Sequence, residues 1–207
     1  MNNDIFKFIQ FNVCQDFDGM KVGSDGVMLG AWAKGGNRIL DVGTGTGLIA
    51  LMMSQRFPNA EVLAIDISED AFAQAGRNVA NSKFADRIEV RHISFQDLSV
   101  ANRFDAIVTN PPFFIDSLKN PNQTRNLARH TDMLSYSDLF HSAKRLLTNE
   151  GCLSAIIPSD YKDRFVQEAC ICGFFISRMY GIKTVERKPV KRYLLEFKLK
   201  RSDVIDA

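Results

Sequence analysis

The sequence predicts an α/β protein built on a single doubly wound, mostly parallel β-sheet, and three observations support this fold class. Short apolar runs alternate with helical patterns from Arg38 onward, as expected where crossover helices join parallel strands. The runs are rich in Val, Ile and Leu, which is typical of strands buried on both faces. After Gly173, two more strand-like runs follow without a helix between them and predict an antiparallel pair at one edge.

Seven apolar runs are expected to form the strands of this sheet. They cover residues 38–42, 61–65, 88–92, 104–109, 152–157, 174–180 and 193–200. Before them, Phe6, Phe8, Phe11 and Val13 predict an additional N-terminal strand or hairpin. The helix predicted over residues 47–56 is apolar most of the way round, so we expect it to be deeply buried. Three later helices begin at side chains that can accept a hydrogen bond from a free backbone N–H, namely Ser68, Ser135 with Asp138, and Ser159.

The length and composition predict one globular domain over residues 1–207. The chain has 207 residues, of which 45% are hydrophobic and 24% are charged, enough for a sizeable core. No apolar run approaches the roughly 20 residues that span a bilayer, and no secretory signal is visible. The four cysteines, at positions 14, 152, 170 and 172, lack the spacing and the nearby histidines of a zinc site. We therefore expect a cytoplasmic protein with reduced core thiols, no bound metal and no membrane contact.

The net charge of +2 conceals an asymmetry along the chain. Residues 1–177 carry 17 Lys and Arg against 20 Asp and Glu, whereas residues 178–207 carry 9 against 4. A local cationic surface can attract a polyanion even when the whole chain is close to neutral. Charges that guard an exposed sheet edge are the simpler explanation, and the sequence leaves both open. The first explanation would use the cations between the last two strands, which are Arg187, Lys188, Lys191 and Arg192.

A glycine-rich turn closes the first sheet strand and opens the following helix. It begins at Asp41 and has glycines at Gly43, Gly45 and Gly47, which let the backbone turn sharply and let a ligand approach without meeting a Cβ. Asp66 ends the next strand, where a carboxylate can accept hydrogen bonds from both hydroxyls of a ribose. The G-x-G-x-G spacing differs from that of dinucleotide-binding proteins, and Asp41 would repel a pyrophosphate but attract a sulfonium. The pattern therefore favours S-adenosyl-L-methionine as the cofactor.

Asp97 follows the third sheet strand at the same edge. Its carboxylate could accept a hydrogen bond from the exocyclic amine of the cofactor's adenine. It could equally cap the next turn of the chain, although the glycine-rich turn upstream favours the cofactor contact.

The fourth sheet strand ends in Asn110-Pro111-Pro112-Phe113. The two prolines stiffen the backbone and remove two N–H donors, which leaves carbonyl oxygens as acceptors beside the carboxamide oxygen of Asn110. These acceptors can hold both hydrogens of a planar amino group and direct its nitrogen lone pair at the methyl group of a sulfonium. The ring of Phe113 offers a face on which an aromatic base can stack. The four residues are therefore candidate catalytic residues for methyl transfer to an amino nitrogen.

These motifs together resemble a known family. Residues 41–47, Asp66, Asp97 and residues 110–113 resemble the motif series of class I S-adenosyl-L-methionine-dependent methyltransferases that act on amino nitrogens. The chemistry of residues 110–113 is shared by enzymes that methylate DNA, ribosomal RNA and a release-factor glutamine.

A second resemblance narrows the choice within that class. Residues 20–32 closely resemble the segment before the first strand in the bacterial tRNA (adenine-N6)-methyltransferases that modify valine tRNA beside the anticodon. The phenylalanine-rich start, residues 128–130 and residues 192–197 fit the same family, so the resemblance covers nearly the whole chain. One departure is Phe113, where many relatives have tyrosine. Stacking survives that change, whereas any role for a phenolic hydroxyl does not.

The resemblance implies the class I methyltransferase fold, a Rossmann-like seven-stranded sheet, with residues 1–37 as an N-terminal extension over the cofactor site. It implies that Ser24 and Asp25 lie over the methionyl end of the cofactor, with Lys21 nearby. The polar loop at residues 116–130 is expected to touch the substrate. The implied activity is methyl transfer from S-adenosyl-L-methionine to the N6 amine of an adenine in tRNA, with tRNA as the partner and no obligate protein partner.

Two alternatives remain on the same fold. A release-factor-type protein methyltransferase, acting on a glutamine amide, would share the chemistry of residues 110–113. Such relatives usually carry an additional N-terminal substrate-binding domain, and only 37 residues precede the first predicted sheet strand here. A non-catalytic RNA-binding protein would keep the fold without the reaction, and the intact residues 110–113 argue against it.

Overall fold

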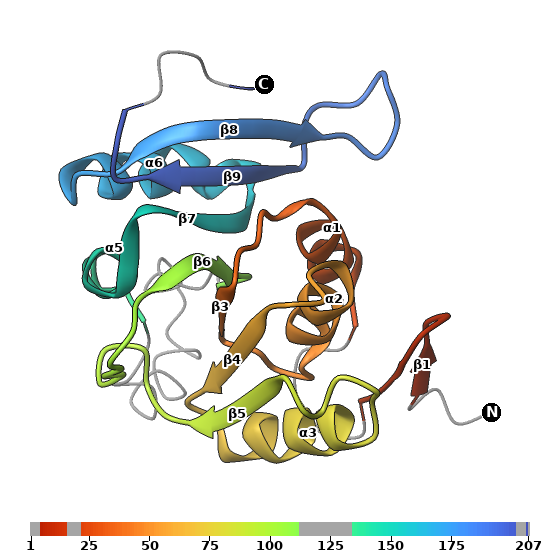
Figure 1. Ribbon diagram of the computed structural model, residues 1–207. Helices are drawn as coiled ribbons and strands as arrows, with labels where there is room; N and C mark the ends of the chain where they lie inside the picture. Colours follow the sequence, from red (N-terminus) through yellow and green to blue (C-terminus); the bar gives the residue numbers. More distant parts are fainter. Residues whose placement is uncertain (1–4, 16–21, 112–133, 202–205, 207) are drawn as a thin grey trace, which may run out of the picture.

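A seven-stranded sheet forms the centre of the molecule, and a small two-stranded hairpin lies to one side (Figure 1). The computed structural model describes residues 5–15, 22–111, 134–201 and 206. The hairpin consists of β1 (Ile5–Lys7) and β2 (Asn12–Cys14), which pair in the antiparallel sense. The predicted N-terminal hairpin is therefore confirmed.

The strands of the large sheet follow the order β5-β4-β3-β6-β7-β9-β8. They are β3 (Arg38–Val42), β4 (Glu61–Asp66), β5 (Ile88–His92), β6 (Phe104–Thr109), β7 (Leu147–Pro158), β8 (Phe175–Ile182) and β9 (Arg192–Lys198). The strands from β3 to β7 pair in the parallel sense, whereas β9 pairs antiparallel with both β7 and β8. The doubly wound, mostly parallel sheet and the antiparallel pair at one edge are thus confirmed. Within that pair, β9 comes later in the chain but lies between β7 and β8.

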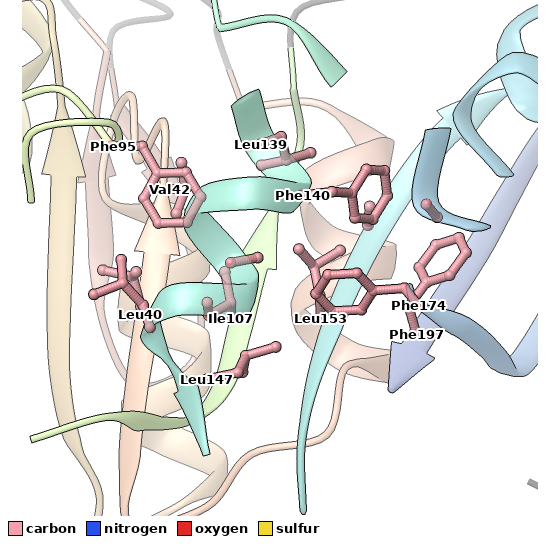
Figure 2. Close-up of a cluster of buried hydrophobic side chains, with 14 of the residues drawn as sticks. Leu40, Val42, Phe95, Ile107, Leu139, Phe140, Leu147, Leu153, Phe174 and Phe197 are labelled. Atoms are coloured by element: carbon pink, nitrogen blue, oxygen red, sulfur yellow. The ribbon is translucent and has the colours of Figure 1, made fainter. Parts of the chain in front are cut away.

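Helices cover both faces of the sheet. One face carries α1 (Ser24–Trp32), α2 (Leu48–Arg56) and α3 (Glu69–Ala80), and the other carries α5 (Tyr136–Leu146) and α6 (Lys162–Ile171). Strand β3 shows the division, because Ile39 packs in the cluster of α2 whereas Leu40 packs in the cluster that contains Phe140 (Figure 2). Ile39 and Leu40 are therefore buried on opposite faces of β3, as predicted for a buried parallel strand. No helix in the described ranges is long and apolar enough to cross a membrane.

Two of the three predicted helix caps are confirmed and the third is wrong. Ser68 and Ser135 each accept a hydrogen bond from the backbone N–H three residues later, at the starts of α3 and α5. Ser159 does not cap α6, because the 3₁₀ turn η2 (Ser159–Tyr161) comes first and leads directly into that helix. The Ser159 hydroxyl donates instead to Oδ1 of Asp160 at 3.3 Å, and its backbone N–H donates to the Lys191 carbonyl at 3.1 Å.

The cysteines are all free, and one of them departs from the prediction of core thiols. Cys152 and Cys172 are buried and Cys14 is partly buried, but Cys170 is exposed because it lies on the solvent side of α6. Burial raises the pKa of the Cys152 thiol to about 12, so this group stays protonated at neutral pH. Among the described residues, no cluster of three or more His, Cys, Asp or Glu side chains could hold a metal ion.

Candidate active site

Three neighbouring strands end in line at one edge of the sheet. Val42 on β3 is the partner of Thr109 on β6 and of Ile65 on β4. The Thr109 hydroxyl also donates a 3.0 Å hydrogen bond to the Val42 carbonyl, which ties β6 to β3 at this level. Adjacent strands lie about 4.8 Å apart, so the residues that come next on the three strands are neighbours as well. These residues are Asn110, Gly43 and Asp66.

The glycine-rich turn leaves an open space beside its backbone. Gly43, Gly45 and Gly47 have φ angles of 70°, 57° and 81°, in the left-handed region that side chains other than glycine rarely adopt. A Cβ added at Gly43 or Gly45 would meet no described atom within 4 Å. A Cβ at Gly47 would instead touch Ala75 of α3 at 3.4 Å. The first two glycines therefore border a space that a ligand can enter, whereas the third allows close packing of a helix.

Asp66 joins this turn to the end of β4. Its Oδ2 accepts a 2.9 Å hydrogen bond from the Gly45 N–H, and its Oδ1 accepts a 3.0 Å bond from the Ser68 N–H. A carboxylate has about four lone-pair positions, so these two bonds leave acceptor capacity for hydroxyl groups. Asp66 therefore combines a structural contact with the turn and the acceptor geometry expected for a ribose site.

Asp41 is the last residue but one of β3, and its side chain contacts the turn and the start of α2. Its side chain is fully buried on the side of the sheet that α2 covers. Its Oδ2 accepts hydrogen bonds from the Thr44 hydroxyl at 2.6 Å and from the Ala50 N–H at 3.1 Å. Ala50 lies in the first turn of α2, whose N-cap residue Gly47 has no side chain to offer. Asp41 therefore holds the turn and caps the helix through Oδ2, while its Oδ1 has no hydrogen-bond partner among the described residues. The attraction of a sulfonium by this carboxylate stays a prediction.

Burial also changes the acidity of this carboxyl group. Desolvation raises the pKa of Asp41 from 3.8 to about 7, and the hydrogen bonds from Thr44 and Ala50 offset only part of the rise. The folded protein therefore binds a proton at Asp41 more tightly than the unfolded chain does. The contribution of this group to stability is present below about pH 4 and is lost as the pH rises toward 7.

Asp41→Asn is expected to remove this pH dependence. Relative to wild type, the free energy of unfolding of the variant should increase between pH 5 and pH 7, by at most about 1.4 kcal/mol per pH unit, and should level off above pH 7. Urea unfolding of both proteins at intervals of half a pH unit measures the difference. Parallel stability curves for the two proteins across this range would show that Asp41 is already ionised in the folded state at pH 5.

The N-terminus of α1 lies beside the start of α2. Gly26 packs so closely on α2 that an added Cβ would lie 3.1 Å from the Leu48 side chain, one residue after the glycine-rich turn. Ser24 is exposed, and the Asp25 carboxylate forms a 2.8 Å ion pair with the Nε of Arg192. The structure thus brings Ser24 and Asp25 near the turn, while Lys21 lies outside the described residues.

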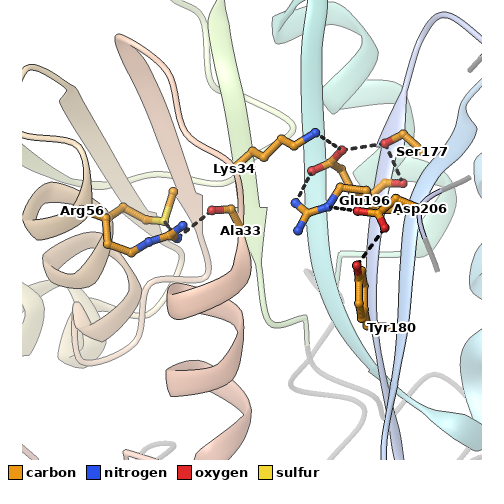
Figure 3. Close-up of polar contacts among 9 residues, drawn as sticks. Ala33, Lys34, Arg56, Ser177, Tyr180, Glu196 and Asp206 are labelled. Carbon is orange, nitrogen blue, oxygen red and sulfur yellow. Dashed lines mark hydrogen bonds and ion pairs between the residues drawn. The ribbon is translucent and has the colours of Figure 1, made fainter.

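The C-terminal end of α1 is fixed by a second set of polar contacts (Figure 3). The Arg56 guanidinium of α2 donates hydrogen bonds to the carbonyls of Gly30 and Ala33, at 2.8 and 2.7 Å. Lys34 pairs at 3.4 Å with Glu196 of β9, whose buried carboxylate also binds Arg178 at 3.0 Å. Side-chain contacts therefore hold both ends of α1 in place beside the glycine-rich turn.

Asp97 lies in an exposed turn after β5. Its Oδ2 accepts a 2.6 Å hydrogen bond from the hydroxyl of Ser94, three residues earlier, so the observed contact is not the predicted cap of the next turn. The contact of Asp97 with the adenine stays a prediction. Arg145 of α5 donates to the carbonyls of Leu98 and Gln96, at 2.6 and 3.0 Å, on both sides of Asp97. The sequence analysis missed Arg145, and no local pattern marks it because its partners lie almost 50 residues earlier in the chain.

His92 and Ile67 lie beside Asp66 at the same edge of the sheet. His92 is the register partner of Asp66, and its Nε2 lies 2.9 Å from the Ile67 carbonyl. The ring of His92 also stacks on Phe72. The side chain of Ile67, the residue after Asp66, is apolar and 49% exposed. The contact between His92 and Ile67 depends on the pairing of β4 with β5, which a sequence alone does not provide.

The predicted catalytic residues are only partly visible. Asn110 is partly buried and Pro111 is buried at the end of β6. Pro112 and Phe113 lie outside the described residues, as does the loop at residues 116–130. The structure therefore brings Asn110 and Pro111 to the glycine-rich turn and leaves the position of the Phe113 ring undetermined.

The class of protein that this fold and site define is a methyltransferase. The family model of the methyltransferase small domain matches residues 23–169, which include α1, the glycine-rich turn and Asn110. Solved structures agree with the fold. A predicted O-methyltransferase from Agrobacterium tumefaciens superposes with a TM-score of 0.64 at 20% identity, covering 84% of this chain and 79% of the other. A glycopeptide N-methyltransferase solved with S-adenosyl-L-methionine gives 0.64 at 13% identity, covering 87% and 90%.

Curated relatives define the family more narrowly. A protein of Phocaeicola vulgatus is 50% identical over 200 residues, which is 96% of this chain and 85% of the relative. A protein of Vibrio campbellii is 42% identical over 193 residues, covering 92% and 81%. Both carry the name tRNA1(Val) (adenine(37)-N6)-methyltransferase. With this similarity over nearly the full length, the chain belongs to the family of these tRNA (adenine-N6)-methyltransferases.

Proposed function

We propose that this protein transfers the methyl group of S-adenosyl-L-methionine to the N6 amine of adenine 37, next to the anticodon, in valine tRNA. The substrate is inferred from the names of its relatives. The reaction is supported by the alignment of Asn110, Gly43 and Asp66 at one sheet edge, because a group that can hold an amine lies beside a turn that can hold the methyl donor. Since tRNA is used in translation, we place the protein in the cytoplasm, without a membrane or an obligate protein partner.

The residues of the site fit this cofactor. The open side of Gly43 and Gly45 admits the ligand to the backbone, and Asp66 has the acceptor capacity to bind both ribose hydroxyls. Asp97 is proposed to contact the adenine. The close packing of α1 on α2 supports residues 1–37 as an extension over the methionyl end, with Lys21, Ser24 and Asp25 as its contacts. Asp41 and Gly47 contribute by shaping the turn.

The chemistry needs orientation more than a strong base. When bound, S-adenosyl-L-methionine supplies a methyl group made electrophilic by its sulfonium. The Asn110 side-chain oxygen and the Pro111 carbonyl are proposed to accept hydrogen bonds from the two N–H groups of the adenine amine. The nitrogen lone pair then points at the methyl carbon. Pro112 is proposed to stiffen this segment and Phe113 to stack on the base, as the sequence predicts. A nitrogen–carbon bond forms as the sulfur–carbon bond breaks, and the amine then loses one proton to water.

Asp66→Ala is expected to weaken binding of S-adenosyl-L-methionine by about 10- to 150-fold. This range corresponds to about 1.5–3 kcal/mol for the loss of hydrogen bonds to a charged acceptor. Titration calorimetry measures the affinity. Asp70→Ala is the matched control. It removes the same charge from an exposed position in the first turn of α3, four residues after Asp66, and should leave the affinity unchanged. Equal affinities for wild type and Asp66→Ala would remove Asp66 from the cofactor site.

The proposed substrate is tested by comparing three kinds of possible substrate. The protein is incubated with labelled S-adenosyl-L-methionine and, separately, with total tRNA, ribosomal RNA and a protein extract, and the products are digested and identified. We expect N6-methyladenosine from tRNA. A methylated glutamine in protein would support the release-factor-type alternative, and no product in any of the three would support the non-catalytic alternative.

A further inference from the structure

We infer that the β8–β9 loop, residues 183–191, binds the phosphate backbone of the tRNA while the target adenine occupies the active site. This inference rests on the proposed function and extends it by naming the surface that holds the substrate. Asn110, Pro111, Asp66 and the glycine-rich turn, which are proposed to hold the base and the cofactor, carry no positive charge that could contact phosphates.

The charge of the loop is strongly one-sided. Its cations Lys183, Arg187, Lys188 and Lys191 are all exposed, and Glu186 is the only carboxylate between them. Arg187, Lys188 and Lys191 form no ion pair with any residue that the structure describes. Three unpaired cations on one short loop suit a polyanion, because each can replace a counterion of the phosphate backbone.

The loop projects from the same edge of the sheet as the active site. β8 runs parallel to β3 and β6, since each of the two antiparallel pairings of β9 reverses the direction once. Ile182 therefore ends β8 at the edge where Gly43 and Asn110 follow their strands. The Lys191 N–H donates a 2.8 Å hydrogen bond to the Ile182 carbonyl and closes the base of the loop. Figure 1 shows the loop extending beyond β8 and β9 on the side of α1.

Arg192 connects this loop to the cofactor side of the molecule. It is partly buried and forms the 2.8 Å ion pair with Asp25, so it differs from the three cations before it. Asp25 precedes Gly26, which packs against Leu48 beside the glycine-rich turn. The sequence expectation grouped Arg192 with the phosphate contacts. The structure assigns it instead to anchoring the loop next to the active site.

Protection of an exposed edge strand against pairing with other chains does not explain the cations of the β8–β9 loop. β8 is the outermost strand, and its one cation, Arg178, turns toward the buried Glu196. The outer side of β8 is in part covered by Asp206, which exchanges backbone hydrogen bonds with Ser177 and Met179. The loop cations lie beyond the end of β8, where they protect no unpaired strand. Phosphate binding therefore explains their position and edge protection does not.

The test compares two variants that lose the same charge. The first carries Arg187→Gln, Lys188→Gln and Lys191→Gln. The control carries Lys198→Gln, Lys200→Gln and Arg201→Gln, which lie at the opposite end of β9. Binding of an unmodified valine tRNA transcript is measured by fluorescence anisotropy over a range of salt concentrations, together with methylation of the same transcript and binding of S-adenosyl-L-methionine.

The loop variant is expected to lose about two units of the salt slope, because each phosphate contact contributes about 0.7 to 0.9. Its tRNA affinity at 0.1 M salt should fall by at least about tenfold, while the control and cofactor binding stay close to wild type. An unchanged salt slope for the loop variant, or an equal loss of tRNA affinity in both variants, would overturn the inference. If the wild-type protein still methylates tRNA in that case, the proposed function stands. Wild-type protein that methylates no tRNA would overturn both.

Discussion

Replacing Asn110 by alanine is expected to reduce the turnover number of tRNA methylation by about 10²–10³-fold, the effect of removing one group that orients a transition state. Affinity for S-adenosyl-L-methionine should stay within a few-fold of wild type, because Asn110 is proposed to act on the amine of the substrate. Single-turnover methylation assays measure the first quantity and calorimetry the second. The two measurements together separate a catalytic defect from a damaged cofactor site.

The opposite end of the same strand provides a control for Asn110→Ala. Asn102 is exposed just before β6, and Asn102→Ala should leave both turnover and cofactor affinity unchanged. At the stacking position, Phe113→Tyr should retain activity and Phe113→Ala should lose it, since only the first keeps an aromatic face. An Asn110→Ala protein that methylates tRNA at a rate near wild type would show that the orientation mechanism is wrong.

Phe140→Ala is expected to lower the free energy of unfolding by about 3–5 kcal/mol, the usual cost of removing a buried aromatic side chain. Phe140 is completely buried between α5 and the sheet. Its ring centroid lies 4.9, 5.3 and 5.4 Å from those of Phe165, Phe174 and Phe197, so the substitution leaves a cavity where α5, α6 and β9 meet (Figure 2).

Urea unfolding at neutral pH measures this effect. Phe175→Ala is the matched control, because Phe175 is 42% exposed on β8 and its replacement should cost far less. Similar losses for both variants would mean that the aromatic cluster is not a rigid part of the core.

The local part of the fold could be predicted from the sequence because its causes are local. Apolar runs mark the buried strands, and β3, β5 and β6 have the predicted boundaries. Ser68 and Ser135 cap their helices through backbone groups only three residues away. The glycine-rich turn could be recognised because left-handed backbone conformations restrict the choice of residue.

The remaining features depend on contacts between distant segments. The hydrogen bond of the Ala50 N–H to Asp41 depends on the side of β3 on which α2 packs, so it could not be foreseen from the sequence. The ion pair of Arg192 with Asp25 joins residues 167 positions apart. Ser159 does not have its predicted capping role, because the chain makes a 3₁₀ turn before α6 and the hydroxyl donates to Asp160. Its backbone N–H bonds to Lys191, more than 30 residues later. No periodicity or spacing encodes these partners.

The insertion of β9 between β7 and β8 sets a late step in biosynthesis. β8 leaves the ribosome before β9, yet its partner strand in the sheet is β9, so β8 cannot join the sheet until residues 192–198 have also emerged. Until then β7 exposes an unpaired edge of apolar backbone that can pair with other chains. A folding intermediate that lacks β8 and β9 therefore exposes a sheet edge that the folded protein covers. Closure of the sheet by the final hairpin ends this exposure and forms the base of the β8–β9 loop in the same event.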